Sequence, residues 1–145
     1  MEIKSFWKDK VRKLIDPDLF SSKAEKLAEE IYREQKESKG GKANKPSQIR
    51  KFYDEVLRFD TELKTNPAEF ENKLPYIKML NAKAAYAMGR DLVSKGFKDF
   101  ISASLNQIKD KDDFDAFAGL FEAFMGYYKY YDEKGATLFT QGGRI

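Results

Sequence analysis

The sequence contains no cysteine and no histidine. The absence of cysteine excludes disulfides, thiolate zinc sites and cysteine nucleophiles. The absence of histidine removes the commonest general base and the commonest metal ligand. No apolar run approaches the roughly 18 residues that a membrane-spanning helix needs, and scattered charges near the N-terminus are unlike a signal peptide. We therefore expect a cytoplasmic protein that binds without catalysing and that uses no metal or cofactor.

Glycine and proline are also few, with nine and four residues in a chain of 145. Between these breakers, apolar residues recur at spacings of three and four, which is typical of amphipathic helices. No pattern indicates a strand or a hairpin turn. The sequence therefore predicts an all-α fold, a small bundle of about five to six helices in one domain over residues 1–145. The predicted helices cover about residues 5–15, 22–37, 47–63, 75–96, 97–108 and 113–133, with a short helical turn over 67–71.

Two segments lack the helical pattern. Residues 38–46 combine glycine, proline and lysine without an apolar anchor, which predicts a flexible basic loop. Ser47 is then expected to cap the next helix. Gly135 is expected to stop the last helix, and the residues after about 138 are expected to form a loose tail.

The last predicted helix carries an aromatic stripe with strict three-four spacing. Such a stripe could stack nucleic-acid bases, but it is more typical of the buried seam of a bundle. Two further tyrosines, Tyr127 and Tyr130, exceed a single stripe and are predicted to lie at a subunit interface, where tyrosine is enriched. The stripe comprises Phe114, Phe117, Phe121, Phe124, Tyr128 and Tyr131.

An acidic run from Asp110 to Asp115 precedes this helix and raises the question of a calcium loop. An EF-hand loop needs glycine at its sixth position and glutamate at its twelfth. Counted from Asp110, these positions hold Asp115 and Phe121. The pattern fails, so we interpret the run as acids at a helix N-terminus, where the macrodipole favours them. No glycine-rich phosphate loop is present either.

Positive charge is concentrated in two stretches. Residues 36–51 carry six cations and one acid, and residues 73–98 likewise carry six cations and one acid. Residues 109–133 compensate with seven acids and three lysines. Cations on ordered helix faces suit a phosphate backbone, but on composition alone an ordinary solvated lysine-rich surface is the commoner explanation.

Three segments favour the nucleic-acid interpretation over the solvated surface, because they resemble a known family. Residues 45–56, KPSQIRKFYDEV, are similar to the start of the central helix in the small subunit of type III-A CRISPR effector complexes. Residues 74–87 resemble the next long helix of that family, and residues 121–129 resemble its C-terminal helix. The resemblance covers about residues 45–131, and the Ser-Gln-Ile-Arg-Lys run is its most specific part.

This resemblance implies a non-catalytic subunit whose copies stack along the duplex of guide RNA and target RNA. It would contact the target strand and the backbone subunits, while RNase and polymerase activities belong to other subunits. The motif match assigns RNA contact to Gln48, Arg50 and Lys51. Position on the adjoining basic segments adds Lys45, Lys78, Lys83 and Arg90. One alternative is a helical interaction scaffold or dimerisation module without nucleic-acid contact, and a small DNA-binding module ranks lower because no helix-turn-helix signature is recognisable.

Overall fold

The computed structural model describes the backbone of residues 2–140 and the side chains of residues 2–134. Its described part is mainly helical, which confirms the predicted all-α bundle, with one tiny sheet as an addition. The α-helices are α1 (Ala24–Glu37), α2 (Pro46–Thr65), α3 (Phe70–Lys78), α4 (Leu80–Gly89), α5 (Lys95–Asn106) and α6 (Lys111–Thr140). The other elements are strands β1 (Trp7–Asp9) and β2 (Leu14–Ile15), a π-helical turn (Leu19–Lys23) and 3-10 turns (Lys39–Gly41, Pro67–Glu69).

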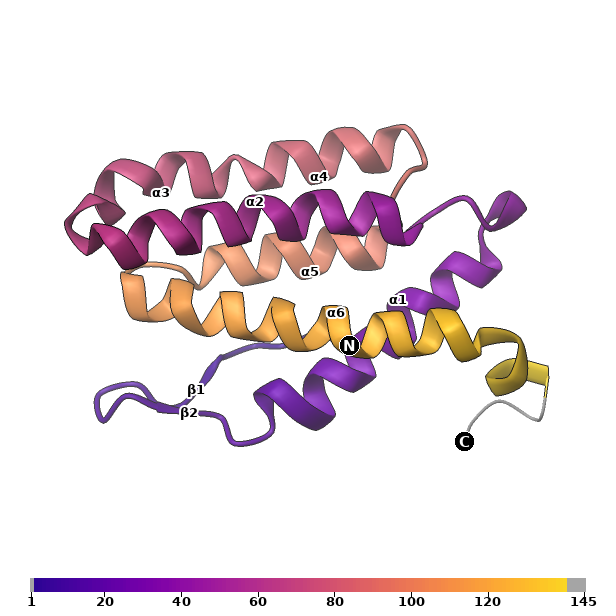
Figure 1. Cartoon of the computed structure of the whole chain (residues 1–145), viewed down its shortest axis with the longest axis horizontal. Helices are drawn as coiled ribbons and strands as arrows, with labels where there is room; N and C mark the ends of the chain where they lie inside the picture. Colours follow the sequence, from indigo (N-terminus) through magenta and orange to yellow (C-terminus); the bar gives the residue numbers. More distant parts are fainter. Residues whose placement is uncertain (1, 141–145) are drawn as a thin grey trace.

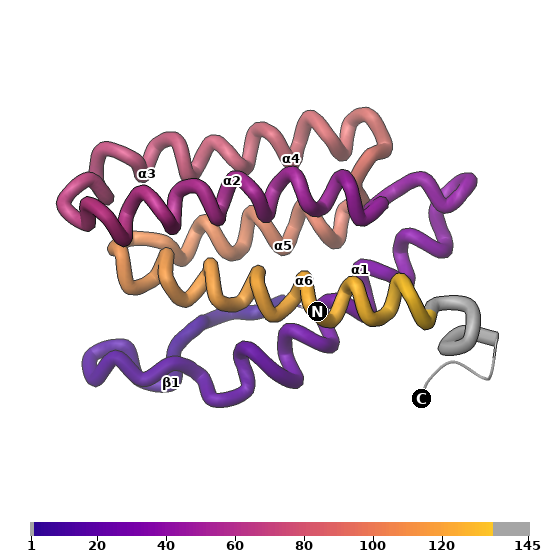
Figure 2. The backbone as a smooth tube through the Cα atoms, in the orientation of Figure 1, coloured from indigo at the N-terminus to yellow at the C-terminus, as the bar shows by residue number. Residues whose placement is uncertain are grey.

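The helices α2, α5 and α6 run side by side with the rod formed by α3 and α4, as Figures 1 and 2 show. The α3–α4 rod returns antiparallel to α2, so that the beginning of α2 and the end of α4 lie at the same end of the bundle. Helix α1 crosses beneath α6 and packs against it. The small hairpin of β1 and β2 lies at the opposite end from the loop that joins α1 to α2 (Figure 1).

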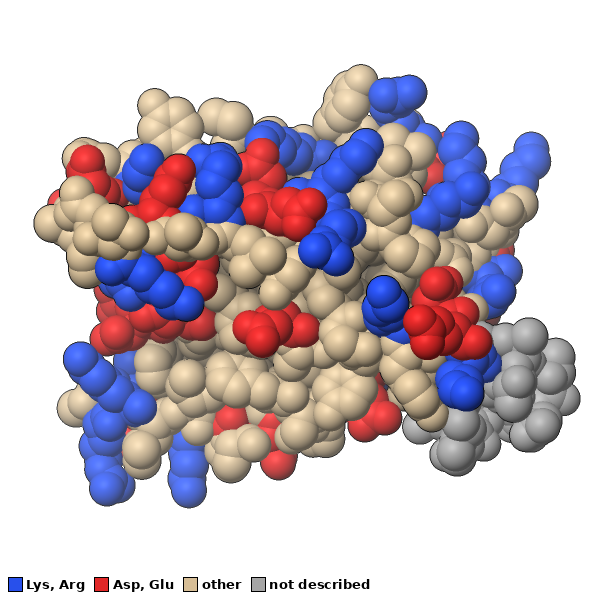
Figure 3. All heavy atoms as spheres, viewed as in Figure 1, with Lys and Arg blue, Asp and Glu red and all other residues tan. Residues whose placement is uncertain are grey.

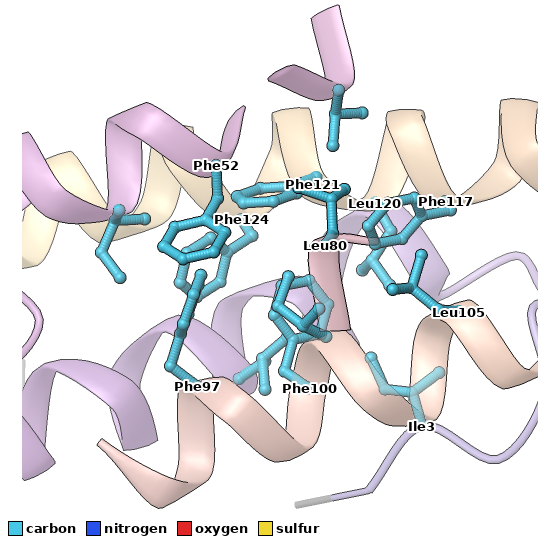
Figure 4. Close-up of a cluster of buried hydrophobic side chains, with 14 of the residues drawn as sticks. Ile3, Phe52, Leu80, Phe97, Phe100, Leu105, Phe117, Leu120, Phe121 and Phe124 are labelled. Atoms are coloured by element: carbon cyan, nitrogen blue, oxygen red, sulfur yellow. The ribbon is translucent and has the colours of Figure 1, made fainter. Parts of the chain in front are cut away.

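Aromatic side chains fill the middle of the bundle, as Figure 4 shows. Phe100 of α5 lies between two α6 rings, with its centroid 5.4 Å from Phe121 and 5.4 Å from Phe124. On α2, an apolar stripe of helical spacing, from Ile49 to Leu63, is buried in the same core. The interpretation of the α6 aromatics as a buried seam is confirmed, because all six are at most 5% exposed.

The predicted first helix, residues 5–15, is wrong. This segment forms the antiparallel β1–β2 hairpin instead, with Trp7 paired to Ile15. Phe6 is buried in the core, whereas Val11, which would share a face with Trp7 in a helix, is 94% exposed. The Gln107 side chain accepts a hydrogen bond from the Phe6 N–H and donates one to the Ile3 carbonyl. Tertiary contacts with α5 thus override the local apolar spacing.

The predicted helix over 75–96 is also divided differently. Pro75 lies inside α3 rather than opening a helix, and α3 and α4 meet at Met79. The rod ends at Gly89, and Asp91 then adopts a left-handed φ of 60° that no helix continues. Ser94 caps α5 by accepting a hydrogen bond from the Phe97 N–H at 3.3 Å. The helix signal in the sequence is therefore real, but a turn at 90–94 interrupts it.

Two expected helix boundaries shift. Ser47 does not cap α2, because the helix already begins at Pro46 and Lys45 occupies the cap position without a side-chain hydrogen bond. Proline suits the first turn, where its missing N–H leaves no bond unmade. Helix α6 continues through Gly135 to Thr140. The predicted loose tail therefore begins inside a helix, and its remainder, 141–145, lies outside the described residues.

The interpretation of the acidic run as a helix N-terminus is confirmed. Asp110 accepts a hydrogen bond from the Asp113 N–H at 2.8 Å, and Asp113 accepts in return from the N–H groups of Lys109 and Asp110. Asp113 also accepts from the Trp7 indole and from the Lys10 ammonium, at 2.8 and 2.9 Å. One buried carboxylate thus caps α6 and fastens the hairpin to it.

Candidate nucleic-acid interface

The loop between α1 and α2 is anchored by Asn44, a fully buried residue. Its side-chain amide donates to the Ile31 carbonyl at 3.1 Å and to the Ser94 hydroxyl at 2.8 Å, and its side-chain oxygen accepts from the Ser94 N–H. The Asn44 N–H donates to the Leu92 carbonyl at 2.9 Å. The sequence predicted a loop without an apolar anchor. That prediction is wrong, because Ala43 is buried beside Asn44.

The carbonyl of Asn44 is equally well bound. It accepts hydrogen bonds from the Gln35 amide of α1, at 2.9 Å, and from the Tyr128 hydroxyl of α6. Burial raises the pKa of Tyr128, so its hydroxyl stays protonated and remains a donor. Asn44 adopts a φ of 63°, a left-handed conformation that asparagine tolerates better than most residues. These bonds fix the residues on either side of Asn44 relative to α1, α5 and α6.

The contacts of Asn44 with Leu92 and Ser94 join the two basic stretches that are separate in the sequence. Lys42 and Lys45 lie on either side of Asn44, Lys51 lies in the first turns of α2, and Arg90 follows the end of α4. All four are exposed. We call this cluster of Lys42, Lys45, Lys51 and Arg90 the basic end. Figure 3 shows cationic side chains gathered over the same end of the bundle.

The adjacent motif residues Arg50 and Lys51 face different flanks of α2. Arg50 lines a groove of about 700 Å³ between the start of α2 and α6, together with Lys129 and Tyr130. Lys51 shares its flank with Glu55 one turn later, and Glu55 accepts from Lys83 of α4 at 3.1 Å. Lys51 therefore faces the α4 side, toward the basic end, whereas Arg50 does not.

Intramolecular acids already engage two of the predicted RNA-binding cations. Arg50 pairs with Asp54 at 3.1 Å, and both side chains are more than half exposed. Lys83 pairs with Glu55, which also pairs with Arg58 at 2.7 Å. The hydrogen bond from Arg58, and then that from Lys83, lowers the pKa of Glu55 although burial opposes them. Exposed pairs of this kind are weak and exchangeable, so they leave both cations accessible to a stronger anion.

The remaining predicted residues are less well placed. Gln48 is half-buried, one helical turn before Lys51. Lys78 is half-buried at the end of α3, and a helix turns about 100° per residue, so Lys78 and Tyr76 lie on opposite flanks of buried Ile77. The structure thus gathers Lys45, Lys51 and Arg90 but leaves Lys78 apart from them.

Of the two predicted interface tyrosines, Tyr130 is 41% exposed and Tyr127 is half-buried against the core. Sequence reasoning missed Asn44, whose only signal is its place between Lys42 and Lys45 ahead of a proline. Tyr86, which the spacing places between Lys83 and Arg90 on one side of the helix, is 66% exposed. Within residues 2–134 no cluster of three or more metal-ligating side chains occurs. No helix in the described part of the chain is long and apolar enough to cross a membrane.

The chain is thus a small helical bundle with a group of exposed cations, the basic end, where α2 begins and α4 ends. A family model described as Csm2 Type III-A matches residues 16–134. The chain therefore belongs to the Csm2 Type III-A family, and it is a subunit of the type III-A CRISPR effector complex that associates with the other subunits of that complex. The resemblance seen over residues 45–131 is confirmed. No curated protein and no solved structure matches the chain.

Proposed function

We propose that this subunit is non-catalytic and contacts the backbone of target RNA, within the guide–target duplex, through its basic end. The observation that carries the proposal is the junction at Asn44, where two basic stretches meet although the contacting residues, Asn44 and Ser94, lie 50 residues apart in the chain. Lysine and arginine on ordered helices neutralise phosphates without reading bases. Sequence specificity would then come from guide pairing, as in other RNA-guided effectors.

A charge-reversal pair tests this proposal. We expect Lys51→Glu with Arg90→Glu to weaken binding to duplex RNA by about tenfold or more, because two phosphate contacts become repulsions. The matched control is Lys8→Glu with Lys26→Glu, which changes net charge equally on the hairpin strand β1 and on α1, away from the basic end. Circular dichroism should show the same helicity in both variants.

The control separates a local contact from a general effect of charge. Fluorescence anisotropy with labelled RNA measures both affinities at one salt concentration. Equal weakening by both pairs would assign binding to net charge alone, and unchanged binding by the Lys51, Arg90 pair would remove the basic end from the RNA contact.

The groove beside Tyr130 supports a second part of the proposal, namely that α6 packs against a neighbouring subunit. Tyr130 lies exposed at this groove, between the start of α2 and α6. Tyrosine combines a large apolar surface with a polar tip, which suits interfaces. The neighbour would be a backbone subunit or another copy of this chain. We also keep the proposal that Gln48, Arg50, Lys78 and Lys83, which lie outside the basic end, contact the RNA.

A further inference from the structure

An exposed stripe of large side chains follows one flank of the α3–α4 rod. Its members recur at spacings of three and four and are each offset by about one residue from the buried stripe that holds the rod to the bundle. Tyr76 is 60% exposed, Met79 48% and Tyr86 66%. Single exposed apolar residues are ordinary on a protein surface, but an aligned set on one helix flank indicates a binding surface. The stripe comprises Tyr76, Met79, Lys83, Tyr86 and Arg90.

Within the rod itself, the charge beside this stripe is positive, and the nearest acid that contacts the stripe is Glu55 of α2. Residues 72–90 contain four cations and no acid. Lys83 points across to Glu55 of α2, which places this flank of the rod beside the α2 flank that carries Lys51. At its C-terminal end the stripe reaches Arg90, a member of the basic end. The stripe is therefore continuous with the proposed phosphate-binding surface.

Tyr86 and Arg90 form the most developed part of the stripe. The guanidinium carbon of Arg90 lies 5.7 Å from the centroid of the Tyr86 ring, and its Nη1 donates to the Tyr86 hydroxyl at 3.4 Å. The guanidinium thus restrains an otherwise exposed ring. Restrained aromatic rings beside arginines are the groups on which proteins stack unpaired bases.

We propose that this stripe binds a single-stranded stretch of RNA, with bases stacked on Tyr86 and Tyr76 and phosphates held by Lys83 and Arg90. The proposal rests on the proposed function, because the strand would continue from the basic end. At 1.5 Å per residue, Tyr76 and Tyr86 lie roughly 15 Å apart along the rod, far enough to hold two separate bases. Tyrosine, methionine and arginine also occur at protein interfaces, but the lysine at the centre of the stripe and the absence of acids from residues 72–90 favour nucleic acid, with the exposed Lys83–Glu55 pair exchangeable for a phosphate.

The experiment compares single-stranded and duplex RNA. The probes are a short fluorescent adenosine RNA strand and a duplex of the same length, measured with the full chain. We expect Tyr76→Ala with Tyr86→Ala to weaken single-strand binding on the order of tenfold or more, with duplex binding unchanged. The phenylalanine pair, which keeps both rings, should bind the single strand within about twofold of the wild type. Phe20→Ala, which removes an exposed aromatic ring outside the stripe and outside the proposed interface, is the control and should bind as the wild type does.

The salt dependence separates stacking from charge. The slope of log affinity against log salt depends on how many phosphates the protein neutralises. Because the alanine pair removes no cation, its slope should equal that of the wild type. Wild-type single-strand binding by the alanine pair would overturn the inference, as would a wild type that does not bind the single strand. Loss of other subunits in co-purification, with single-strand binding intact, would overturn it in favour of a protein interface. Unchanged duplex binding in the Lys51→Glu, Arg90→Glu variant would instead contradict the proposed function.

Discussion

Among single residues, Asn44 connects the most elements. Its side chain satisfies two groups at Ser94 and one at Ile31, all partly or fully buried. We expect Asn44→Ala to lower the free energy of unfolding by roughly 3 kcal/mol, because it leaves buried groups unpaired and because alanine tolerates a positive φ less well than asparagine. Urea denaturation measures the loss.

Asn44→Gly is the matched variant, since glycine removes the same hydrogen bonds but tolerates the φ of 63°. We expect it to be more stable than Asn44→Ala by about 1 kcal/mol. Equal stability of the two variants would contradict the argument from φ, and wild-type stability of both would contradict the anchoring role of Asn44.

Asp113 makes a pH-dependent contribution to the free energy of unfolding. Its side chain is 2% exposed, and burial alone would raise its pKa. Hydrogen bonds from the Lys10 ammonium, the Lys109 N–H and the Trp7 indole outweigh burial and hold the pKa of Asp113 below its ordinary value of 3.8. Because the pKa is lower in the folded state, the ionised carboxylate stabilises the fold above pH 3.8, and this contribution is lost as pH falls through the lowered pKa.

We therefore expect Asp113→Asn to be less stable than the wild type by about 1–3 kcal/mol at neutral pH, with the difference shrinking below pH 3.8. Trp7 is the only tryptophan, so its emission also reports whether the hairpin stays on α6. Lys26→Gln, an exposed substitution on α1, serves as a control without this pH dependence. A stability difference independent of pH would contradict the role of the ionised carboxylate.

At the scale of elements, α6 illustrates how far periodicity predicts the fold. Its aromatic spacing identified the buried seam residue by residue, because a helix 30 residues long repeats the same face many times. Helices α1, α2 and α5 were also predicted, with boundaries shifted by a few residues. The hairpin was not, because the apolar spacing of residues 5–15 mimics a helix and only contacts of Ile3, Phe6 and Trp7 with distant elements decide otherwise.

The α6 seam yields a stability prediction. The Phe121 ring lies within 6.3 Å, between centroids, of the rings of Phe97, Phe100 and Phe124. Phe121→Ala should destabilise the protein by about 3–5 kcal/mol, through lost burial and the cavity left behind. Tyr130→Ala on the same helix should cost much less, on the order of 1 kcal/mol, since that residue is 41% exposed and lies outside the buried seam. Similar losses in the two variants would contradict the packing described here.

The site was predicted less completely than the fold. The composition identified both basic stretches, and the Ser47–Lys51 run indicated the family. What the sequence could not show is that Arg50 and Lys51, adjacent in the motif, face α6 and α4 respectively. Nor could it show that Asn44 holds the two basic stretches together, since its partner Ser94 lies 50 residues away.

At the scale of the whole molecule, the proposed RNA contact and the proposed subunit packing centre on different surfaces. Tyr130, which is 41% exposed, lies on α6, whereas the RNA-binding proposal centres on the basic end. We expect Tyr130→Ala to reduce co-purification of the other effector subunits while leaving RNA affinity within about twofold, since no phosphate contact is lost. Intact assembly would contradict the interface proposal. A parallel loss of RNA affinity would show that the two surfaces are not separate.

The most direct test of the central claim is the salt dependence of RNA affinity in charge-neutralising variants. If about four phosphates are neutralised, log affinity should fall against log salt with a slope near −0.7 times that number. Lys51→Gln and Arg90→Gln should each reduce the magnitude of the slope by about 0.7, whereas Lys8→Gln should leave it unchanged. Equal slopes in the wild type and in all three variants would contradict RNA binding through the basic end.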